Sequence, residues 1–337
     1  MAQAAVSNTL KRQARQLFED EADREAFVRA VTQPQSFPVA IVWLRPRPVP
    51  CPFQMLPRYD WLPDSVDLVS IQQRPGRHEL HEQGAYYCLD PSSVFMAQAL
   101  RPVESADVVL DVCASPGGKS VLAWQQLKPQ LLVSNEVIGK RIAPLISNLK
   151  RCNVAPSRVL NLDPKVLAEE AVQSADVVLV DAPCSGQSLP ARGRESPGCF
   201  HPATINTNAN RQRRILANAA GTVRPGGWLA YMTCTYAVKE NERNVDWFLR
   251  RFPRFESVAV PQLEAFRSSY SENHCYRMWP MQGQGAGGFF ATFRRTVDGD
   301  EAVRPGDLTR LRVRWQNNAG DERTADQSQG DSKNNRR

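Results

Sequence analysis

A short loop after an apolar run carries residues that suggest ligand binding. The loop DVCASPGGKS, Asp111–Ser120, ends like a phosphate-binding loop, whose pattern is G-x-x-x-x-G-K-[ST]. The first glycine of that pattern is replaced here by Cys113, and a residue with a side chain does not readily adopt the positive φ that the glycine supplies. We therefore do not expect the loop to hold a nucleoside triphosphate, and its glycines must serve another ligand.

Acidic residues that follow the next apolar runs indicate what this ligand is. Glu136 lies 19 residues after Gly117, where a carboxylate commonly binds the ribose hydroxyls of a nucleoside cofactor. Asp163 closes the third run, where an acid can accept from an adenine amino group. The loop is not G-x-G-x-x-G, so no pyrophosphate is expected, and S-adenosylmethionine fits this set best. The alternative is an ordinary helix-entry turn with two solvated acids.

Two cysteines end later apolar runs, Cys184 in DAPCSG and Cys234 in MTCT. The carboxyl ends of parallel strands meet at one edge of a sheet, so both thiols are expected to face the same pocket, beside the cofactor's methyl group. Carbon 5 of a pyrimidine is a poor nucleophile. A thiolate that adds to carbon 6 makes the ring enamine-like, and carbon 5 can then attack a sulfonium methyl. A base then removes the carbon 5 proton and the thiol is eliminated.

A regular alternation of short apolar runs and helical segments positions these residues from about residue 105 onward. The runs VVLDVC, LLVSNE, RVLNLD and DVVLVDA predict a parallel sheet with helices on both faces. Further along, 205–220 and ENERNVDWFLRRF predict helices, and GGWLAYMTC and GGFFATFRR predict strands. Ligands of such sheets bind outside the carboxyl ends of the strands, where the acids and thiols lie.

The residues before 84 differ from the rest in composition and in their pattern of apolar residues. Two short helical patterns lie within 1–35, VAIVWL predicts a strand, and the proline-dense RPRPVPCPF must be extended or irregular. Arg45, Arg47 and Arg58 lie among aromatic residues, a mixture suited either to RNA phosphate contacts with base stacking or to an ordinary surface loop. The aromatic residues are Trp43, Phe53, Tyr59 and Trp61. At the other end, 297–337 is expected to be a disordered tail beyond its RLRVRW patch.

Composition limits the class of protein. The 337 residues carry a net charge of +7 with a pI near 9.1, which favours a nucleic-acid partner without establishing one. Eight cysteines and four histidines show no zinc-ligand spacing, so no metal is expected. No apolar run reaches the about 18 residues of a membrane span, and no secretion signal is visible. A cytoplasmic monomer is the default expectation.

In their order along the chain, these motifs resemble those of the Sun family of RNA (cytosine-5)-methyltransferases, the bacterial RsmB/RsmF-like enzymes. The resemblance runs from about Gly84 to Arg295 and rests on DVCASPGGKS, NEVIGKRIAPLISNLKRC, DAPCSG, RPGGWLAYMTCT followed by KENE, and GGFFATF. It implies an α/β, Rossmann-like S-adenosylmethionine-dependent methyltransferase domain at 84–296 with a seven-stranded, mostly parallel sheet. A small N-terminal α+β RNA-binding region, 1–83, would precede it.

The resemblance also implies roles for individual residues. Cys234 of the Thr-Cys motif would be the nucleophile, and Cys184 would break down the covalent adduct, whereas DNA cytosine-5 methyltransferases use a Pro-Cys nucleophile. Lys119 and Asp181 would hold the polar edge of the target base. The residues implied for the cofactor site are Cys113, Ala114, Ser115, Pro116, Gly117, Gly118, Lys119, Glu136, Asp163 and Asp181.

Departures from the family pattern concern the substrate side. Leu89 stands where glutamine is usual, and Ser188 replaces a glycine. The expected function is methylation of carbon 5 of a cytosine in structured RNA, ribosomal RNA before transfer RNA, with a non-catalytic RNA-binding protein and a DNA methyltransferase as the other hypotheses. Candidate contacts to the RNA backbone are Arg45, Arg47, Arg192, Arg194, Arg211, Arg213 and Arg214.

Overall fold

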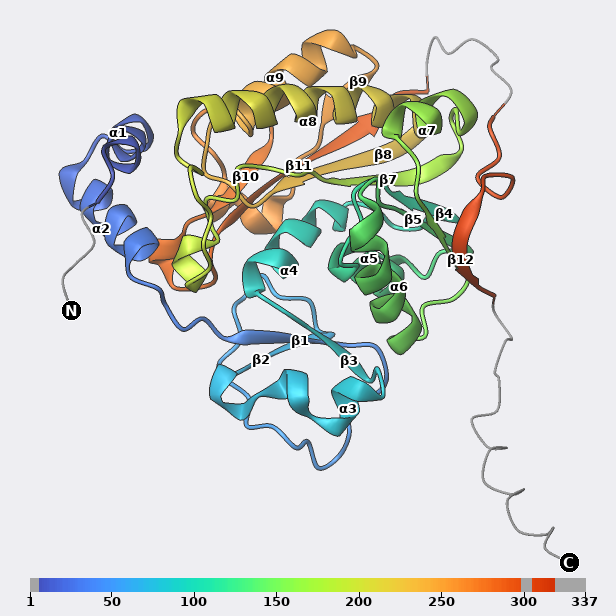
Figure 1. Ribbon diagram of the computed structural model, residues 1–337, viewed down its shortest axis with the longest axis horizontal. Helices are drawn as coiled ribbons and strands as arrows, with labels where there is room; N and C mark the ends of the chain where they lie inside the picture. The colour runs from blue at the N-terminus through green and yellow to red at the C-terminus, as the bar shows by residue number, and fades with distance from the viewer. Residues whose placement is uncertain (1–5, 298–304, 319–337) are drawn as a thin grey trace, which may run out of the picture.

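The computed structural model describes residues 6–297 and 305–318. The chain opens with two short helices, α1 (Asn8–Leu17) and α2 (Glu21–Thr32), as the sequence predicts. Each begins at a polar cap, because Ser7 accepts from the backbone N–H of Leu10 and Asp20 accepts from two N–H groups of the first turn of α2. Their apolar side chains pack with Tyr236 and Trp279, so the helices dock at one end of the larger domain (Figure 1).

A small antiparallel sheet follows, in the strand order β2-β1-β3. Its strands are β1 (Val39–Trp43), β2 (Val66–Val69) and β3 (Tyr86–Leu89), and the short helix α3 (Glu79–Glu82) precedes β3. The strand expected at VAIVWL is thereby confirmed. Because β3 lies beyond the domain boundary expected at residue 83, the small sheet is built across that boundary.

The large sheet has nine strands, with the order β10-β11-β8-β7-β4-β5-β6-β12 and β9 paired to β11. The five strands from β8 to β6 are mutually parallel, and the others pair antiparallel. The bounds are β4 (Val108–Asp111), β5 (Leu131–Asn135), β6 (Ser157–Leu160), β7 (Ala175–Asp181), β8 (Val223–Thr233), β9 (Phe255–Ser257), β10 (Cys275–Met278), β11 (Gly288–Arg295) and β12 (Val313–Asn317).

The number of strands corrects an expectation from the sequence. Seven strands were expected, of which six were placed on named runs; the strands that no run predicted are β9 and β10, both beside β11, and β12, which closes the other edge against β6. In the described part of the tail, 305–318, the RLRVRW patch leads into β12, which forms a ladder with β6. The polar string ADQSQGDSKNNRR lies outside the described residues.

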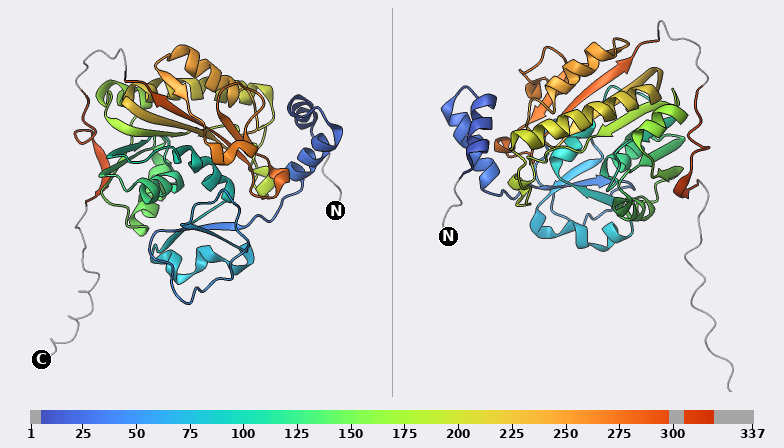
Figure 2. Two further views of the ribbon diagram at one scale, coloured as in Figure 1. Left: turned by 180° about the vertical axis from the view of Figure 1, so that it is seen from behind. Right: turned by 45° about the horizontal axis from the view of Figure 1, so that its top comes forward.

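Helices cover both faces of the large sheet and form two separate cores. On β7, Val177 and Leu179 belong to one core, and Val178 and Val180 belong to the other, as the alternation of side chains along a strand requires. The first core includes residues of α4 (Pro91–Ala97), α5 (Gly118–Leu127) and α6 (Ile142–Arg151), and the second includes residues of α7 (Pro164–Glu170), α8 (Pro202–Thr222) and α9 (Glu242–Arg251). Figure 2 shows the two layers from behind and from above.

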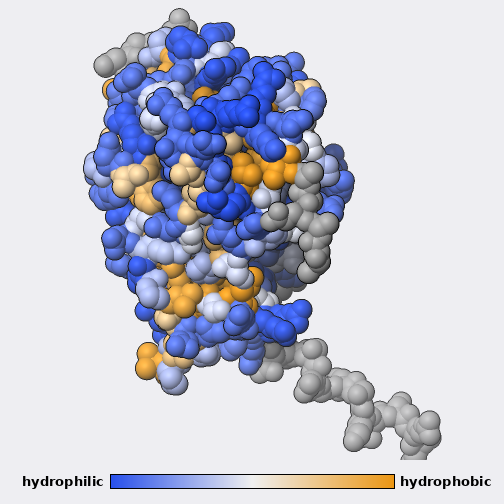
Figure 3. Space-filling model, turned by 90° about the vertical axis from the view of Figure 1, so that its left-hand side faces the viewer, coloured by the Kyte–Doolittle hydropathy of each residue, from blue (hydrophilic) through white to orange (hydrophobic). Residues whose placement is uncertain are grey.

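The small sheet shares the first of these cores. Val66 and Leu68 of β2 and the nearby Trp61 pack with Phe95 of α4, so the N-terminal region and the large domain are joined by continuous apolar packing. The face that carries α1 and α2 is mostly hydrophilic, with small separate apolar areas (Figure 3). Within the described ranges, no helix combines the length and the apolar character that crossing a bilayer requires.

Candidate active site

The loop between β4 and α5 is shaped by two glycines. Gly117 caps α5 with φ at +109°, and a Cβ on it would lie 3.2 Å from the Leu145 side chain of α6. A Cβ on Gly118 would lie 2.9 Å from Leu89, so the residue that departs from the family pattern packs directly against the loop. Gly117 is therefore favoured by its backbone conformation, and Gly118 by the close approach of Leu89.

A buried polar network supports the loop from below. Asp111 is fully buried, and its two carboxylate oxygens accept from Ser120 Oγ at 2.7 Å and from the backbone N–H of Cys113 at 3.3 Å. Ser134 Oγ on β5 lies 3.0 Å from Ser120 Oγ and extends the network to the next strand. Burial raises the pKa of Asp111 to about 7, so this carboxyl is close to half protonated at neutral pH.

Glu136 is positioned to hold a nucleoside, as its place after β5 predicts. The Glu136 side chain is buried, with 2% of its surface exposed. Its Oε1 accepts from the backbone N–H of Ile138 at 2.9 Å. Its Oε2 makes no hydrogen bond, although the Arg141 guanidinium lies 3.1 Å away. A buried carboxylate oxygen without a hydrogen-bond donor has the capacity to accept from a ribose hydroxyl. Val137 and Ile138 beside it are exposed apolar side chains, which suits an adenine ring.

Arg141 joins Glu136 to the glycine loop. Besides its ion pair with Glu136, its guanidinium donates to the carbonyl of Ser115, and Ser115 Oγ donates back to the carbonyl of Arg141 at 2.8 Å. The loop residues Ala114 and Pro116 are thereby held beside Glu136. The role of Arg141 is not visible in the sequence, because it depends on a contact with the separate segment at Ser115. Ile138 lies two residues after Glu136, and no motif marks it.

Asp163 occupies a different position from the one its motif suggests. β6 ends at Leu160, and Asn161 and Leu162 form a turn that is held by hydrogen bonds to Asn135 and to the carbonyl of Glu136. Asp163 is exposed, and it caps α7 by accepting from the backbone N–H of Lys165 at 2.8 Å. Its contact with adenine stays a prediction.

The two thiols expected at the sheet edge lie side by side. β7 and β8 are neighbouring parallel strands, and Cys184 and Cys234 follow their carboxyl ends with the two sulfur atoms 3.2 Å apart. Both are partly exposed. Lys119 Nζ, from the first turn of α5, lies 3.1 Å from Asp181 Oδ2 at the end of β7. The structure therefore brings together four residues from three segments of the sequence.

The surroundings make the two thiols unequal. A hydrogen bond from Cys184 lowers the pKa of Cys234, and the Lys119 ammonium acts in the same direction. The pKa of Cys184 is raised well above its ordinary value, because Cys184 shares this hydrogen bond with Cys234, is buried and lies near the Glu240 charge. The surroundings therefore favour ionisation of Cys234 over that of Cys184. Burial raises the pKa of Cys113, which makes this third thiol a poor nucleophile.

A cavity of about 580 Å³ opens above Lys119 and Asp181. Its walls come from the small sheet, from the glycine loop and from the segment after Cys184, and they include Tyr87, Leu89 and Arg192. Arg192 Nε lies 3.3 Å from Asp90, the cap of α4, which fixes this wall. The volume lies in the range of small-ligand pockets and is ample for a single nucleobase.

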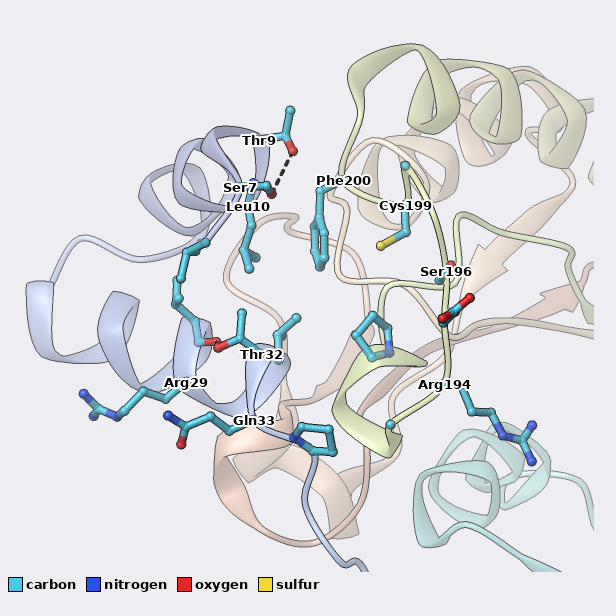
Figure 4. A pocket seen from close by; sticks show the side chains of 18 residues that line it. Ser7, Thr9, Leu10, Arg29, Thr32, Gln33, Arg194, Ser196, Cys199 and Phe200 are labelled. Carbon is cyan, nitrogen blue, oxygen red and sulfur yellow. Dashed lines mark hydrogen bonds between the residues drawn. The ribbon is translucent and has the colours of Figure 1, made fainter. Parts of the chain in front are cut away.

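A second cavity, of about 760 Å³, lies between the N-terminal helices and the segment 190–200 (Figure 4). Leu10 of α1 and the ring of Phe200 face each other across it, and Arg29 and Arg194 lie at its margin. Arg194 lines the 580 Å³ cavity as well, so the two cavities adjoin.

The arginine and aromatic residues of the N-terminal loop have mostly internal partners. Arg58 donates to the carbonyls of Val66 and Pro63, and Arg47 pairs with Asp67 at 2.7 Å. The aromatic side chains Trp43, Phe53 and Trp61 are buried. The structure thus favours ordinary packing over base stacking for this group. Within the described residues, no cluster of three or more potential metal ligands is found.

A family profile described as 16S rRNA methyltransferase RsmB/F matches residues 97–294, more than half of the sequence. The chain belongs to this family. The family is S-adenosylmethionine-dependent and methylates cytosine at carbon 5 in RNA. Three features of the site fit that cofactor: the Glu136 oxygen that makes no hydrogen bond, the exposed apolar side chains after Glu136, and the glycine loop.

Similar proteins support this assignment. The chain is 29% identical over 254 residues to ribosomal RNA small subunit methyltransferase F of Pectobacterium carotovorum, covering 73% of this chain and 52% of the relative. It is 33% identical over 165 residues to the protein of that name from Vibrio parahaemolyticus, covering 48% and 34%. The chain thus spans about half the length of the curated relatives it matches.

One solved structure shows the same fold. NSun6 from Pyrococcus horikoshii, crystallised with SFG, superposes with a TM-score of 0.72 over 87% of this chain and 98% of that protein, at 18% identity. SFG is an analogue of S-adenosylmethionine.

Proposed function

We propose that this chain methylates carbon 5 of a cytosine in RNA, with small-subunit ribosomal RNA as the favoured substrate. The observation that carries the proposal is the pair of unequal thiols 3.2 Å apart, together with the Lys119–Asp181 pair, which lines a cavity large enough for one base. The bound cofactor, held by the glycine loop and Glu136, supplies a sulfonium methyl group that an electron-rich carbon can take.

The thiols perform the covalent steps. Cys234 as the thiolate adds to carbon 6 of the flipped-out cytosine, which makes carbon 5 nucleophilic. Lys119 stabilises the negative charge that develops on the polar edge of the ring, and Asp181 can accept a hydrogen bond from the amino group of the base. After the methyl group is gained at carbon 5, loss of the proton from that carbon returns its electron pair to the ring, and the bond between sulfur and carbon 6 breaks.

Cys184 is suited to take the carbon 5 proton because its acidity changes during the reaction. In the resting pair, the hydrogen bond to Cys234 and the negative charge on Cys234 raise the pKa of Cys184. Once Cys234 is a thioether, both of these causes are gone, and Cys184 ionises more readily. The thiol that is inert at the first step thereby becomes the base for the last.

The cavity between α1, α2 and segment 190–200 is proposed to receive the RNA beside the target base. Its margin shares Arg194 with the base cavity, and Phe200 offers a ring on which a neighbouring base can stack. Transfer RNA remains the second candidate substrate, because structured loops with exposed bases occur in both classes of RNA. A cytoplasmic location stays a prediction.

The experiment is nucleoside mass spectrometry on unmodified small-subunit ribosomal RNA and on transfer RNA, incubated with S-adenosylmethionine and the purified chain. We expect 5-methylcytidine in the ribosomal RNA, and its loss with Cys234→Ala. Product in transfer RNA alone would refute the favoured substrate. An active Cys234→Ala would refute the assignment of the nucleophile, and no product with either RNA would refute the proposed activity.

A further inference from the structure

Glu240 is a buried acid that lies next to both cysteine turns. It is fully buried in the segment between β8 and α9. Its Oε2 accepts from the backbone N–H of Ser185 at 2.9 Å and from Gln212 Nε2 at 2.8 Å, and its Oε1 accepts from Ser185 Oγ at 2.5 Å. Thr235 Oγ1 lies 3.4 Å from Oε1. Ser185 follows Cys184 and Thr235 follows Cys234, so one carboxyl group holds the residue after each thiol.

The partners of Glu240 indicate that it is ionised. The N–H groups of Ser185 and Gln212 can only donate, and Ser185 Oγ can donate to Glu240 while it accepts from Thr235 Oγ1 at 2.8 Å, which suits a carboxylate that can only accept. Burial raises the pKa of Glu240, and these hydrogen bonds oppose that effect. Gln212 also donates to the carbonyl of Pro183, just before Cys184, so the same group of contacts encloses the Cys184 turn on both sides.

The position of the charge matters because it acts on one thiol more than on the other. Glu240 makes two short hydrogen bonds to Ser185, which follows Cys184, and only a 3.4 Å contact to Thr235, which follows Cys234. Its charge disfavours ionisation of Cys184. On Cys234, the Lys119 ammonium favours ionisation and the Asp181 carboxylate opposes it. Other titratable groups near the pair and Glu240 include Tyr231, Tyr236 and Cys199, and burial raises the pKa of each, which favours their neutral forms.

We propose that Glu240 is a positioning residue that holds the two cysteine turns in register and whose negative charge keeps Cys184 in the thiol form, so that Cys234 is the thiolate. The inference rests on the proposed function for its purpose, since the order of the two thiols matters only if one must attack and the other must wait. Its physical content, the difference between the two thiols, is independent of any RNA.

The test measures the alkylation of each thiol by iodoacetamide as a function of pH, on the full chain without RNA or cofactor. Because alkylation of one thiol changes its neighbour, Cys184 is followed in Cys234→Ala and Cys234 is followed in Cys184→Ala, by mass spectrometry of the modified peptides. Glu240→Gln is then added to each variant. The amide has the shape of the carboxyl group and can pair with the same partners, so mainly the charge is removed.

We expect Glu240→Gln to increase the alkylation rate of Cys184 about tenfold at a pH below its midpoint, which corresponds to one pKa unit. The rate for Cys234 should change much less. Glu240→Asp, which retains the charge, should keep Cys184 slow, and Glu256→Gln, at an exposed position on β9, should leave both thiols unchanged.

Three results would overturn the inference. Equal effects of Glu240→Gln on both thiols would show that the charge does not discriminate between them, and no effect on either would show that it does not act on them. Loss of folding in Glu240→Gln, seen by circular dichroism, would leave the residue a structural role only. A chain that methylates neither RNA in the earlier assay could still give the expected alkylation rates, so the two proposals fail separately.

Discussion

Replacement of Asp111 by asparagine should change how stability depends on pH. Burial raises the pKa of this carboxyl from 3.8 to about 7. The folded chain therefore binds the proton more tightly than the unfolded chain does. The stability that the protonated carboxyl contributes is fully present below pH 4 and is lost as the pH rises through 7.

The size of the effect follows from the two pKa values. At 1.36 kcal/mol per pKa unit, Asp111 costs about 4 kcal/mol of unfolding free energy at pH 8, and about 2.5 kcal/mol of this cost develops between pH 5 and pH 8. Asparagine is neutral throughout, and its side chain can still accept from the N–H of Cys113 and pair with Ser120 Oγ. The variant should therefore gain about 2.5 kcal/mol relative to wild type over that interval.

Urea unfolding at pH 5, 6, 7 and 8 measures this difference directly. Asp64→Asn is a suitable control, because the Asp64 side chain is exposed and its replacement should give a profile parallel to that of wild type. If the free-energy difference between Asp111→Asn and wild type stayed constant from pH 5 to pH 8, burial would not be holding this carboxyl protonated, and the account of the network below the loop would be wrong.

Three further outcomes are expected. Cys184→Ala should accumulate a covalent complex of Cys234 with RNA, visible as a slowly migrating band in a denaturing gel. The band should be absent when Cys234→Ala is added. Absence of the band from the single variant would contradict a role for Cys184 in adduct breakdown. Ile138→Asp should weaken S-adenosylmethionine binding about tenfold in calorimetry, because it places a charge against the adenine face, whereas Ile71→Asp, also exposed but on the base cavity, should not. Phe200→Ala should raise the KM for RNA by about five- to a hundredfold, because it removes about 1–3 kcal/mol of base stacking, and it should leave kcat unchanged. Phe200→Trp should restore the KM. An unchanged KM in Phe200→Ala would exclude the RNA from this cavity.

The central strands were predictable because their burial is recorded in the sequence itself. A strand covered by helices on both faces must be apolar at nearly every position, and the run that forms β7 is buried along almost its whole length. Once β7 and β8 are recognised as parallel strands, their carboxyl ends lie at one edge, and the meeting of Cys184 with Cys234 follows. The same reasoning placed Glu136 after β5.

The edges of the sheet and the roles of single charged residues were not predictable in this way. β9 has only three residues, and its sequence, FES, has no pattern that distinguishes it from a loop. β12 begins in the RLRVRW run, whose alternation of polar and apolar residues is typical of a half-buried strand, but the run does not indicate that its partner is β6. Arg58 binds carbonyls next to its own small sheet, and Asp163 caps α7, because a backbone group or helix end happens to be within reach. Such contacts arise only when the chain is folded, so a motif could not report them.

The identity of the nucleophile shows where the limit lies. Each cysteine stands in a motif that some cytosine-5 methyltransferase uses for attack, so the local sequence leaves the choice open. In the folded chain, the choice depends first on the hydrogen bond between the two thiols and then on charges from other segments: Lys119 on α5, which favours ionisation of Cys234, and Glu240 before α9, which disfavours ionisation of Cys184. Exchange of the charges around the thiols, with both motifs intact, should therefore exchange their order of ionisation.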